Sequence, residues 1–379
     1  MSRDDLDVAL LHVRGDGHGL SRYGDRLAEF LHAGRESGVR VVEADRRALS
    51  PLRELPQLVR ADVVHVQWSP LYWGDTWSAV VRAAVLAVVG AVRPLVVTMH
   101  DVHHEPARVN GDRGVAPPPP SGSSRWARIR RRWKATTSAR NLAQALITRG
   151  AREVVVFSPE EAAQMTRRHA RRVRVVPHFI EQYVEPPSRD PAGKHLVVFG
   201  WIHPRKGQLL AVEALPLLPG WSLTLCGAAE PRHQDYLGRV LARAEELGVG
   251  DRLTVTGFVS DEEMAEVFAQ SRLALCPYQR IAASGSISSL VSRGLPVVAH
   301  STAYTRRLAQ AAPSGVMLFS PWTAEALAAG VLQSAETDVD AQRDELSGLA
   351  LADGPAVTRD RHEQVYRDVL AGSARGRRR

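Results

Sequence analysis

A lysine beside a glycine turn is the first feature of this sequence that could do chemistry. Lys206 lies in the stretch GWIHPRKG, which begins at Gly200 directly after the apolar run LVVF and ends at Gly207. A turn of this kind between a strand and a helix directs backbone N–H groups at one place and suits a phosphate group. Lys206 and its neighbour Arg205 add positive charge. The pattern predicts a phosphate site, and a solvated loop lysine is the simpler alternative.

A second segment with the same capacity is a helix start in the stretch SGSISSLVSR. Ser284, Gly285 and Ser286 begin a helix predicted to run to Arg293, where a small residue lets a phosphate approach and serine hydroxyls add donors. A third segment of the same kind, with a strand, a glycine-containing turn and the start of a helix, includes the run TGFV, which ends at Val259. Helix capping without a ligand is the alternative for the serines. Three such devices in this order are more specific than one.

These segments require strands and helices that bring them together. Short apolar runs alternate with helical stretches along the chain, which is typical of parallel sheets with crossover helices, and their continuous hydrophobicity fits strands covered on both faces. The runs predict strands at 8–13, 39–43, 63–67, 95–100, 154–157, 173–177, 196–200, 222–226, 253–256, 273–276, 296–299 and 315–319.

The length also favours two doubly wound α/β units. At 379 residues the chain is long for one domain, and the stretch EPPSRDPAGK at 185–194 suits a join between two. The run at 109–124 contains PPPPSGSS and predicts a flexible loop. A helix with one apolar face is predicted at 358–370.

Composition limits the classes of partner. The formal net charge is +8, and all but three of the 49 basic residues are arginines, a bias typical of a GC-rich genome. With no aromatic-lined module for nucleic acid, we predict no nucleic-acid partner. Cys226 and Cys276 lie in strand-like apolar runs and are predicted to be buried thiols. The N-terminal stretch has no leader pattern, and the longest apolar run, 83–92, is too short to span a bilayer, so we expect a cytoplasmic protein.

The order and wording of the second half resemble the donor-binding half of retaining glycosyltransferases with the GT-B fold, in family four. The family pattern is a strand, G-x5-K-G, a long helix, a G-[FY]-V strand end, and a helix leading to G-x-P-V-V-A. Gly200, Lys206 and Gly207 match its first part, and GLPVVA, from Gly294, matches its last. The resemblance covers nearly the whole chain. It implies an α/β protein with two Rossmann-like domains facing a central cleft, at 1–187 and 188–355, and a helix at 356–372 that crosses back.

The same resemblance assigns roles in the second domain. Lys206 would contact the donor diphosphate, together with Gly200 and the helix start at 284–286, and Val259 would border the base through its backbone. The usual arginine after Gly200 is Trp201 here, and Arg205 stands where glutamate is commoner, so Arg205 is interpreted as a substitute cation.

One departure concerns the family's pair of glutamates, eight positions apart, which holds the nucleotide ribose and the sugar. Ile281 and Ser289 occupy these places, and neither is acidic. A family branch with SG helix starts lacks the first glutamate. Ser289 is kept as a donor-binding candidate, and ribose recognition stays open.

In the first half the resemblance adds candidates for sugar and acceptor binding. The turn GDGHG supplies Gly17, His18 and Gly19, although a tight strand–helix turn is the alternative. His100 and Asp101 end the strand LVVTM as the family's HD pair does, which would place His100 near the transferred sugar.

His65 ends a similar predicted strand, DVVHVQW, and joins the sugar- and acceptor-binding candidates; a polar strand end without a ligand is the alternative. No metal or cofactor is predicted. His103, His104 and Glu105 lack the spacing of a zinc helix, and the DxD triplets at 5–7 and 338–340 lie at a strand start and in a polar link.

The basic run RWARIRRRWK extends from Arg125 to Lys134. On a helix, Trp126, Ile129 and Trp133 would share one face among arginines, an interfacial pattern that favours contact with an acidic membrane. A clamp for an anionic acceptor and a solvated helix are alternatives.

The sequence therefore predicts a bacterial-type, metal-independent retaining glycosyltransferase. It would transfer a sugar from a UDP-, GDP- or dTDP-linked donor to a hydroxyl of a glycan, a lipid or a secondary metabolite, with Lys206, His100 and Arg205 as the catalytic candidates. A non-catalytic GT-B binding or partner subunit is the alternative, favoured by Ile281 and Ser289. The loops that select the sugar, the base and the acceptor have no sequence motif in common with the family, so the sequence does not identify these three groups.

Overall fold

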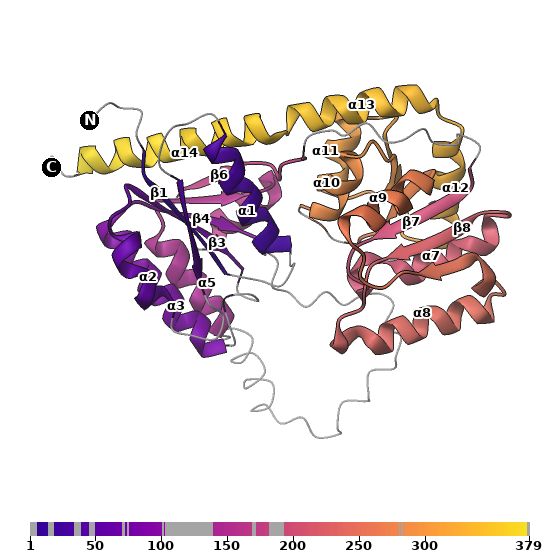
Figure 1. Cartoon of the computed structure of the whole chain (residues 1–379), viewed down its shortest axis with the longest axis horizontal. Coiled ribbons are helices and arrows are strands. Elements are labelled where there is room, and N and C mark those ends of the chain that lie inside the picture. The colour runs from indigo at the N-terminus through magenta and orange to yellow at the C-terminus, as the bar shows by residue number, and fades with distance from the viewer. Residues whose placement is uncertain are drawn as a thin grey trace, which may run out of the picture. The chain divides into compact units, whose positions relative to one another are not determined.

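The computed structural model divides the chain into two compact units (Figure 1). The described residues are 6–13, 19–33, 39–44, 50–69, 73, 76–100, 102, 139–168, 172–181, 193–279, 281 and 283–376. The first unit lies within Met1–Ala107, Arg113–Pro177 and Pro355–Arg379, and the second lies within Arg108–Asp112 and His178–Gly354.

The first unit is built on a six-stranded parallel sheet. Its strands are β1 (Val8–Val13), β2 (Val39–Ala44), β3 (Val63–Trp68), β4 (Leu95–Met99), β5 (Glu153–Val156) and β6 (Val173–Val175). Their order across the sheet is β2-β1-β3-β4-β5-β6. Every residue of β3, β4 and β5 is buried, as expected for strands covered on both faces.

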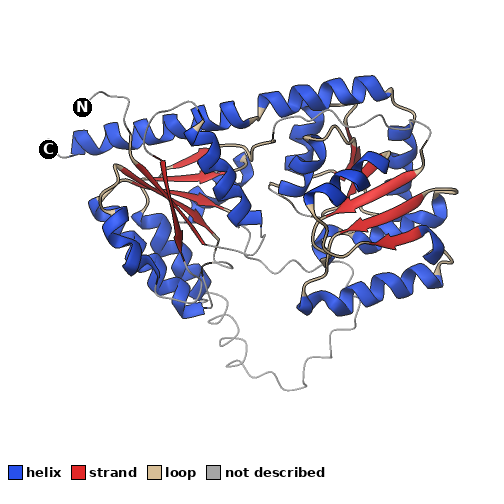
Figure 2. Ribbon diagram, in the orientation of Figure 1, coloured by secondary structure: helices blue, strands red, loops and turns tan. Residues whose placement is uncertain are grey.

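Helices cover both faces of this sheet (Figure 2). They are α1 (Gly19–His32), α2 (Ser50–Leu58), α3 (Thr76–Val92), α5 (Ala139–Gly150), α6 (Pro159–Arg168) and α14 (Pro355–Gly376). Helices α2, α3 and α5 pack together on one face, and α1 packs with α14 on the other.

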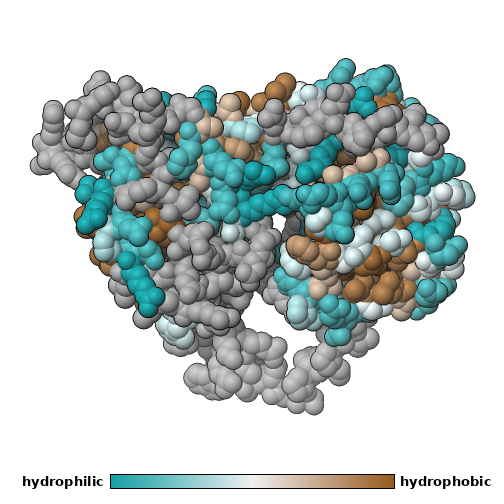
Figure 3. All heavy atoms as spheres, in the orientation of Figure 1, coloured by the Kyte–Doolittle hydropathy of each residue, from teal (hydrophilic) through white to brown (hydrophobic). Residues whose placement is uncertain are grey.

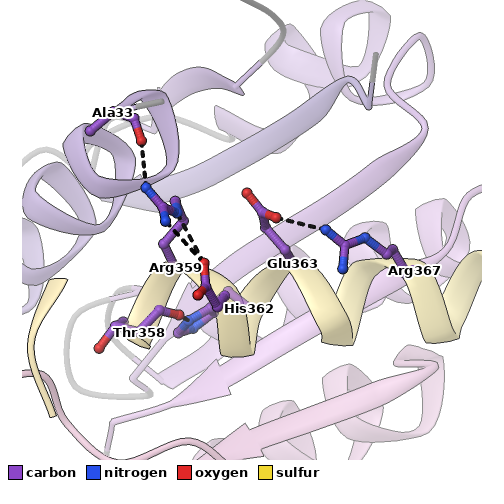
Figure 4. Close-up of polar contacts among 7 residues, drawn as sticks. Ala33, Thr358, Arg359, His362, Glu363 and Arg367 are labelled. Carbon is purple, nitrogen blue, oxygen red and sulfur yellow. Dashed lines mark hydrogen bonds and ion pairs between the residues drawn. The ribbon is translucent and has the colours of Figure 1, made fainter. Parts of the chain in front are cut away.

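The last helix, α14, belongs to the first unit. Its inner face includes the buried ring of Tyr366. Arg359 donates a hydrogen bond of 2.8 Å to the carbonyl of Ala33, directly after α1, and the buried Glu363 pairs with Arg367 at 2.8 Å (Figure 4). The helix predicted from its apolar face is thus present and is longer than predicted.

The second unit repeats the architecture. Its strands are β7 (His195–Phe199), β8 (Ser222–Cys226), β9 (Leu253–Val255), β10 (Leu273–Cys276), β11 (Val297–His300) and β12 (Val316–Phe319). All neighbouring strands are parallel, in the order β12-β11-β10-β7-β8-β9.

Two apolar clusters lie on the two faces of this second sheet. One contains residues of α7 (Gln208–Ala214), α8 (Gln234–Glu246) and α12 (Ala324–Ala335), and the other contains residues of α9 (Asp261–Gln270), α10 (Gly285–Val291), α11 (Ala303–Ala311) and α13 (Val339–Ala352). Alternate strand residues enter alternate clusters, as a pleated strand requires. Cys226 and Cys276 are both free and buried, as predicted.

Each strand predicted from the sequence occurs, with ends that differ by two residues at most. The two doubly wound parallel sheets confirm the predicted fold class.

On the visible face of the molecule, hydrophilic residues predominate and hydrophobic ones form smaller patches (Figure 3).

Candidate active site

The candidate site lies where the strand order of the second sheet reverses. From β7 the chain builds β8 and β9 on one side, and it then crosses over to build β10, β11 and β12 on the other. The carboxyl ends of β7 and β10 diverge at this switch point, which is where open α/β sheets bind ligands. Residues after these two strands therefore lie together although they are far apart in the sequence.

Lys206 is held at this switch point by three oxygen atoms. It ends the short 3₁₀ turn η1 (Pro204–Lys206) that follows β7. Its Nζ donates to the Ser286 hydroxyl at 2.7 Å, the Tyr278 hydroxyl at 3.2 Å and the Phe199 carbonyl at 3.2 Å. All three partners are neutral at physiological pH. The bonds therefore orient the ammonium without neutralising its charge.

The backbone at Gly200 makes room for this ammonium. Gly200 has φ +106°, and a Cβ built there would lie 2.5 Å from Lys206 Nζ and 2.8 Å from Ser286 Oγ. Any other residue would be strained and would also push the lysine away. Gly200, Lys206 and Ser286, named separately from the sequence, are thus brought together.

Desolvation, with a smaller contribution from the positive charge of Arg205, lowers the pKa of Lys206 to about 8. The Cys276 thiol nearby is neutral, because burial raises its pKa to about 12. An anion that enters the site would stabilise the ammonium and raise the pKa of Lys206 again. Within the described residues Lys206 forms no ion pair, so there it is a cation without a counterion.

Tyr278, two residues after β10, is a member of the site that sequence reasoning missed. Its ring lies 4.9 Å from Lys206 Nζ, and its hydroxyl also contacts Ser284 and Ser286. Burial raises its pKa well above the usual value, so the hydroxyl keeps its proton. The signal available in the sequence was an aromatic residue directly after the strand run LALC.

Helix α10 contributes the serines. Ser284 is its N-cap, and its Oγ accepts a hydrogen bond of 3.1 Å from the N–H of Ile287. Gly285 and Ser286 form the first turn, as predicted, but the helix ends at Val291 and has only seven residues. Its dipole is correspondingly small, so the hydroxyl groups matter more than the helix end.

Two histidines border the serines and Tyr278. His178 Nδ1 lies 2.8 Å from the Phe179 carbonyl, and its Nε2 lies 4.0 Å from the place where a Cβ on Gly285 would stand. Burial lowers the pKa of His178 to about 4, so the ring is neutral and Nδ1 donates to the carbonyl. His300, at the end of β11, lies 3.3 Å from the carbonyl of Tyr278. Neither histidine was identified from the sequence.

The remaining second-unit candidates lie around this centre. Arg205 is exposed, and its N–H donates to His203 Nδ1 at 3.0 Å, which caps η1. Val259 is half-buried against the apolar cluster, beside Phe258, which is 76% exposed. The backbone carbonyl of Ser289, near the end of α10, accepts hydrogen bonds from the side chains of Ser292 and Arg293.

In the first unit, His100 directly follows β4 and is half-buried. Its Nε2 lies 2.8 Å from Gln67 Oε1, and its ring packs edge-on against Tyr23 and Phe157. Gly19 is the first residue of α1. Gly17, His18 and Asp101 lie outside the described residues.

The structure places His65 inside β3 and not at its end. The ring is fully buried, with Nδ1 2.8 Å from the Tyr366 hydroxyl of α14 and Nε2 2.8 Å from Thr98 Oγ1. Burial and the nearby His362 and His100 lower its pKa well below the usual value, so the ring is neutral. In this position His65 joins α14 to the sheet.

Metal ligands and membrane spans can be assessed only for the described part of the chain. There, no three His, Cys, Asp or Glu side chains lie close enough together to hold a metal ion. No helix there has both the length and the apolar character that crossing a membrane requires. His103, His104, Glu105 and the basic run at 125–134 lie outside these residues.

Comparison with known proteins relates the second unit to a described protein family. Residues 193–337 match the family model described as "Glycosyl transferases group 1". No curated protein sequence matches the chain.

Several solved structures share the fold of nearly the whole chain. HepE from Anabaena, solved with UDP-glucose, has a TM-score of 0.68 at 16% identity over 97% of this chain and 100% of that chain. Sucrose-phosphate synthase from Thermosynechococcus elongatus has a TM-score of 0.67 at 17% identity, again over 97% and 100%. WaaG, a glycosyltransferase involved in lipopolysaccharide biosynthesis, has a TM-score of 0.58 at 16% identity over 95% and 99%. The chain therefore has the GT-B fold, and its residues 193–337 match a group 1 glycosyltransferase model.

Proposed function

We propose that this protein is a metal-independent retaining glycosyltransferase of family four. It would transfer a sugar from a nucleotide diphosphate sugar to an acceptor hydroxyl. The observation that carries this proposal is the uncompensated ammonium of Lys206, held by Ser286 and Tyr278 at the switch point of the donor-side sheet. The group 1 domain at 193–337 contains all three residues.

Lys206 has the charge and position that a departing diphosphate needs. Negative charge develops on the phosphate as the bond to the sugar breaks, and a fixed cation in a partly desolvated site stabilises it at little reorganisation cost. Arg205, exposed beside the lysine, can supply a second positive charge. These cations can do the work that a metal ion does in other transferases, so no metal is required.

In a retaining reaction the acceptor hydroxyl attacks the anomeric carbon on the face from which the phosphate leaves. The bond from this carbon to the phosphate oxygen breaks, the bond to the acceptor oxygen forms, and the acceptor proton passes to the departing phosphate. Lys206 would stabilise that phosphate. Through the resemblance, His100 would hydrogen-bond the sugar, and Gly17, His18, Gly19 and Asp101 would lie beside sugar and acceptor.

The alternative of a non-catalytic binding subunit rests on the missing acidic pair. Ile281 packs against the apolar cluster, and Ser289 has a neutral hydroxyl, so neither supplies a carboxylate. Such a subunit would bind the nucleotide sugar through Lys206 without turning it over. Donor binding alone therefore does not separate the two proposals.

The decisive experiment has a binding stage and a turnover stage. Thermal-shift measurements with UDP-, GDP- and dTDP-sugars should identify a donor, since a ligand that binds only the native state raises its melting temperature. Release of the free nucleotide from that donor, with NMR of the product anomer, then tests turnover and retention. An inverted anomer would refute retention, and donor binding without product in any acceptor screen would support the binding subunit.

The bacterial origin, the cytoplasmic location and a peripheral membrane contact through the basic run from Arg125 to Lys134 belong to the same proposal. Vesicle binding by a peptide of residues 125–134 would test the membrane contact.

A further inference from the structure

A series of hydrogen bonds inside the first unit connects His100 with the last helix. His100 Nε2 lies 2.8 Å from Gln67 Oε1, and Gln67 Nε2 lies 3.2 Å from His65 Nε2. On the other side of the His65 ring, Nδ1 lies 2.8 Å from the Tyr366 hydroxyl of α14. Gln67, His65 and Tyr366 are buried, and His100 is half-buried. We call these four residues the His100 network.

The hydrogen bonds at His65 have a defined direction. The ring is neutral, so one nitrogen donates and the other accepts. The Gln67 amide nitrogen can only donate, so His65 Nε2 accepts. The Thr98 hydroxyl, 2.8 Å from the same nitrogen, can donate to it as well. The hydrogen of His65 is therefore on Nδ1, which donates to the Tyr366 hydroxyl.

The same reasoning places a hydrogen on His100. Gln67 Oε1 can only accept, so His100 Nε2 carries a hydrogen and donates it. In the neutral ring Nδ1 then has the lone pair. If His65 carried its hydrogen on Nε2, the Gln67 amide would have to turn over and would then donate to His100 Nε2. The position of the proton on His100 is therefore coupled to its position on His65.

Packing holds the members of the network in place. Tyr23 of α1 and Phe157 after β5 both meet the His100 ring edge-on, with ring centroids 4.9 and 5.2 Å from its own. The backbone carbonyl of Gln67 accepts a hydrogen bond of 2.7 Å from the indole N–H of Trp73. The Gln67 amide can therefore turn over at its end, but the side chain cannot move away from His100.

The groups at the α14 end of the network are neutral. Burial raises the pKa of Tyr366 well above its usual value, so the hydroxyl keeps its proton. The ring of His362 lies 5.6 Å from that of His65 and is neutral as well, because burial lowers its pKa to about 4. Hydrogen bonds between neutral groups therefore decide which nitrogen of each ring carries the proton.

We propose that Gln67 is a positioning residue for His100, and that Tyr366, at the far end of the network, sets which nitrogen of the His100 ring carries the proton. This inference rests on the proposed function, in which His100 contacts the sugar. Because Nε2 is engaged with Gln67, His100 would accept a hydrogen bond from a sugar hydroxyl through Nδ1. A contact that only joined α14 to the sheet would need His65 and Tyr366, but it would not need the bond from Gln67 to His100.

NMR of the full protein with ¹⁵N-labelled histidine tests the proton positions without any substrate. In the unchanged protein His65 should carry its hydrogen on Nδ1, and His100 should carry one on Nε2. In Tyr366→Phe, His65 loses the acceptor for Nδ1–H, so its hydrogen should move to Nε2, where Thr98 can accept it. The Gln67 amide should then turn over, and the hydrogen of His100 should move to Nδ1. A hydrogen on Nε2 of His65 in the unchanged protein, or unchanged rings in a folded Tyr366→Phe variant, would overturn the proposal.

Gln67→Leu interrupts the network with a side chain of similar size. Sugar transfer should fall about tenfold, the cost of one hydrogen bond. Tyr366→Phe should also lower transfer, but it should have no further effect on His100 or on transfer when Gln67→Leu is already present. The matched control is Gln144→Leu, which changes another buried glutamine of the first unit, in contact with the Met165 sulfur at 3.4 Å, and should leave transfer and the His100 ring unchanged.

The two readouts distinguish failure of this inference from failure of the proposed function. The expected proton positions in a protein that transfers no sugar would support the network and refute the proposed function. Full transfer by Gln67→Leu would refute the positioning role and leave the proposed function in place. Equal effects of Tyr366→Phe with and without Gln67→Leu would also refute that role, because they would show that Tyr366 acts only on stability.

Discussion

The Lys206 ammonium and the Ser286 hydroxyl lie 2.7 Å apart, although 80 residues separate them in the sequence. Lys206 follows β7 and Ser286 lies in α10, which follows β10, and these two strands are neighbours at the centre of the second sheet. The sheet topology therefore creates this contact. An anion bound to the lysine can also reach the hydroxyl.

Lys206→Ala should reduce sugar transfer about a hundredfold or more and should leave the fold intact. The reason is the loss of the only ammonium that stabilises the departing phosphate, since removal of one such donor has costs of this order. Lys194→Ala, which changes an exposed lysine of the same unit, is the matched control and should retain full activity. Steady-state kinetics and melting curves of both variants provide the check, and transfer by Lys206→Ala within about threefold of the original rate would contradict the assigned role.

Donor affinity should decrease as the pH rises above about 8. The pKa of Lys206 in the free protein is lowered to about 8, so the ammonium that attracts the diphosphate is present below this pH and is lost above it. One proton is involved, so affinity should decrease about tenfold per pH unit on the alkaline side. Calorimetric titration with the nucleoside diphosphate across this range measures the effect. The Lys206→Met variant should bind weakly and without this dependence, and an unchanged midpoint in that variant would assign the titration to another group.

Gly200→Ala should impair both stability and donor binding. The positive φ of Gly200 should cost an alanine about 1–2 kcal/mol of folding free energy. The added methyl would also displace Lys206 Nζ, 2.5 Å away. Gly248→Ala separates these two effects, because Gly248 has φ +65° and no neighbour within 4 Å of its Cβ position. Unfolding and donor titrations of both variants should show similar losses of stability, with loss of donor affinity only in Gly200→Ala.

Transfer should continue in excess EDTA. Lys206 and Arg205 provide the positive charge that the diphosphate requires, so the proposed mechanism needs no divalent ion. Initial rates before and after chelation measure this directly. Loss of activity that is restored by manganese or magnesium would show that a metal carries the charge, with the triplet at 5–7 and the cluster at 103–105 as the first places to test.

The sequence predicted the sheets, and it named Gly200, Lys206 and Ser286, which the structure brings together, because both depend on local patterns. Buried parallel strands are continuous apolar runs, and the glycine turn and the lysine are adjacent to such a run. Tyr278 and His178 were missed for a different reason. They follow strands without any distinctive motif. Tyr278 lies near Lys206 because β10 pairs with β7, and His178, which follows β6, lies near Gly285 although more than 100 residues separate the two.

The position of His65 also shows that a local sequence pattern does not reveal contacts between residues far apart in the chain. A histidine near the end of an apolar run was interpreted as a strand terminus, but β3 continues to Trp68. The buried partner of His65, Tyr366, lies 301 residues later in the chain. No local pattern can reveal a contact at that separation.

That contact also has a consequence for biosynthesis. The described residues of the second unit fall within 178–354, whereas the first unit includes α14, which is translated after them. Strand β3 is therefore synthesised early, but the contact between His65 and Tyr366 can form only after almost the whole polypeptide has been synthesised. Until then, the side chains of the first unit that α14 covers remain accessible to chaperones, and a nascent chain stalled before Pro355 would keep that surface open.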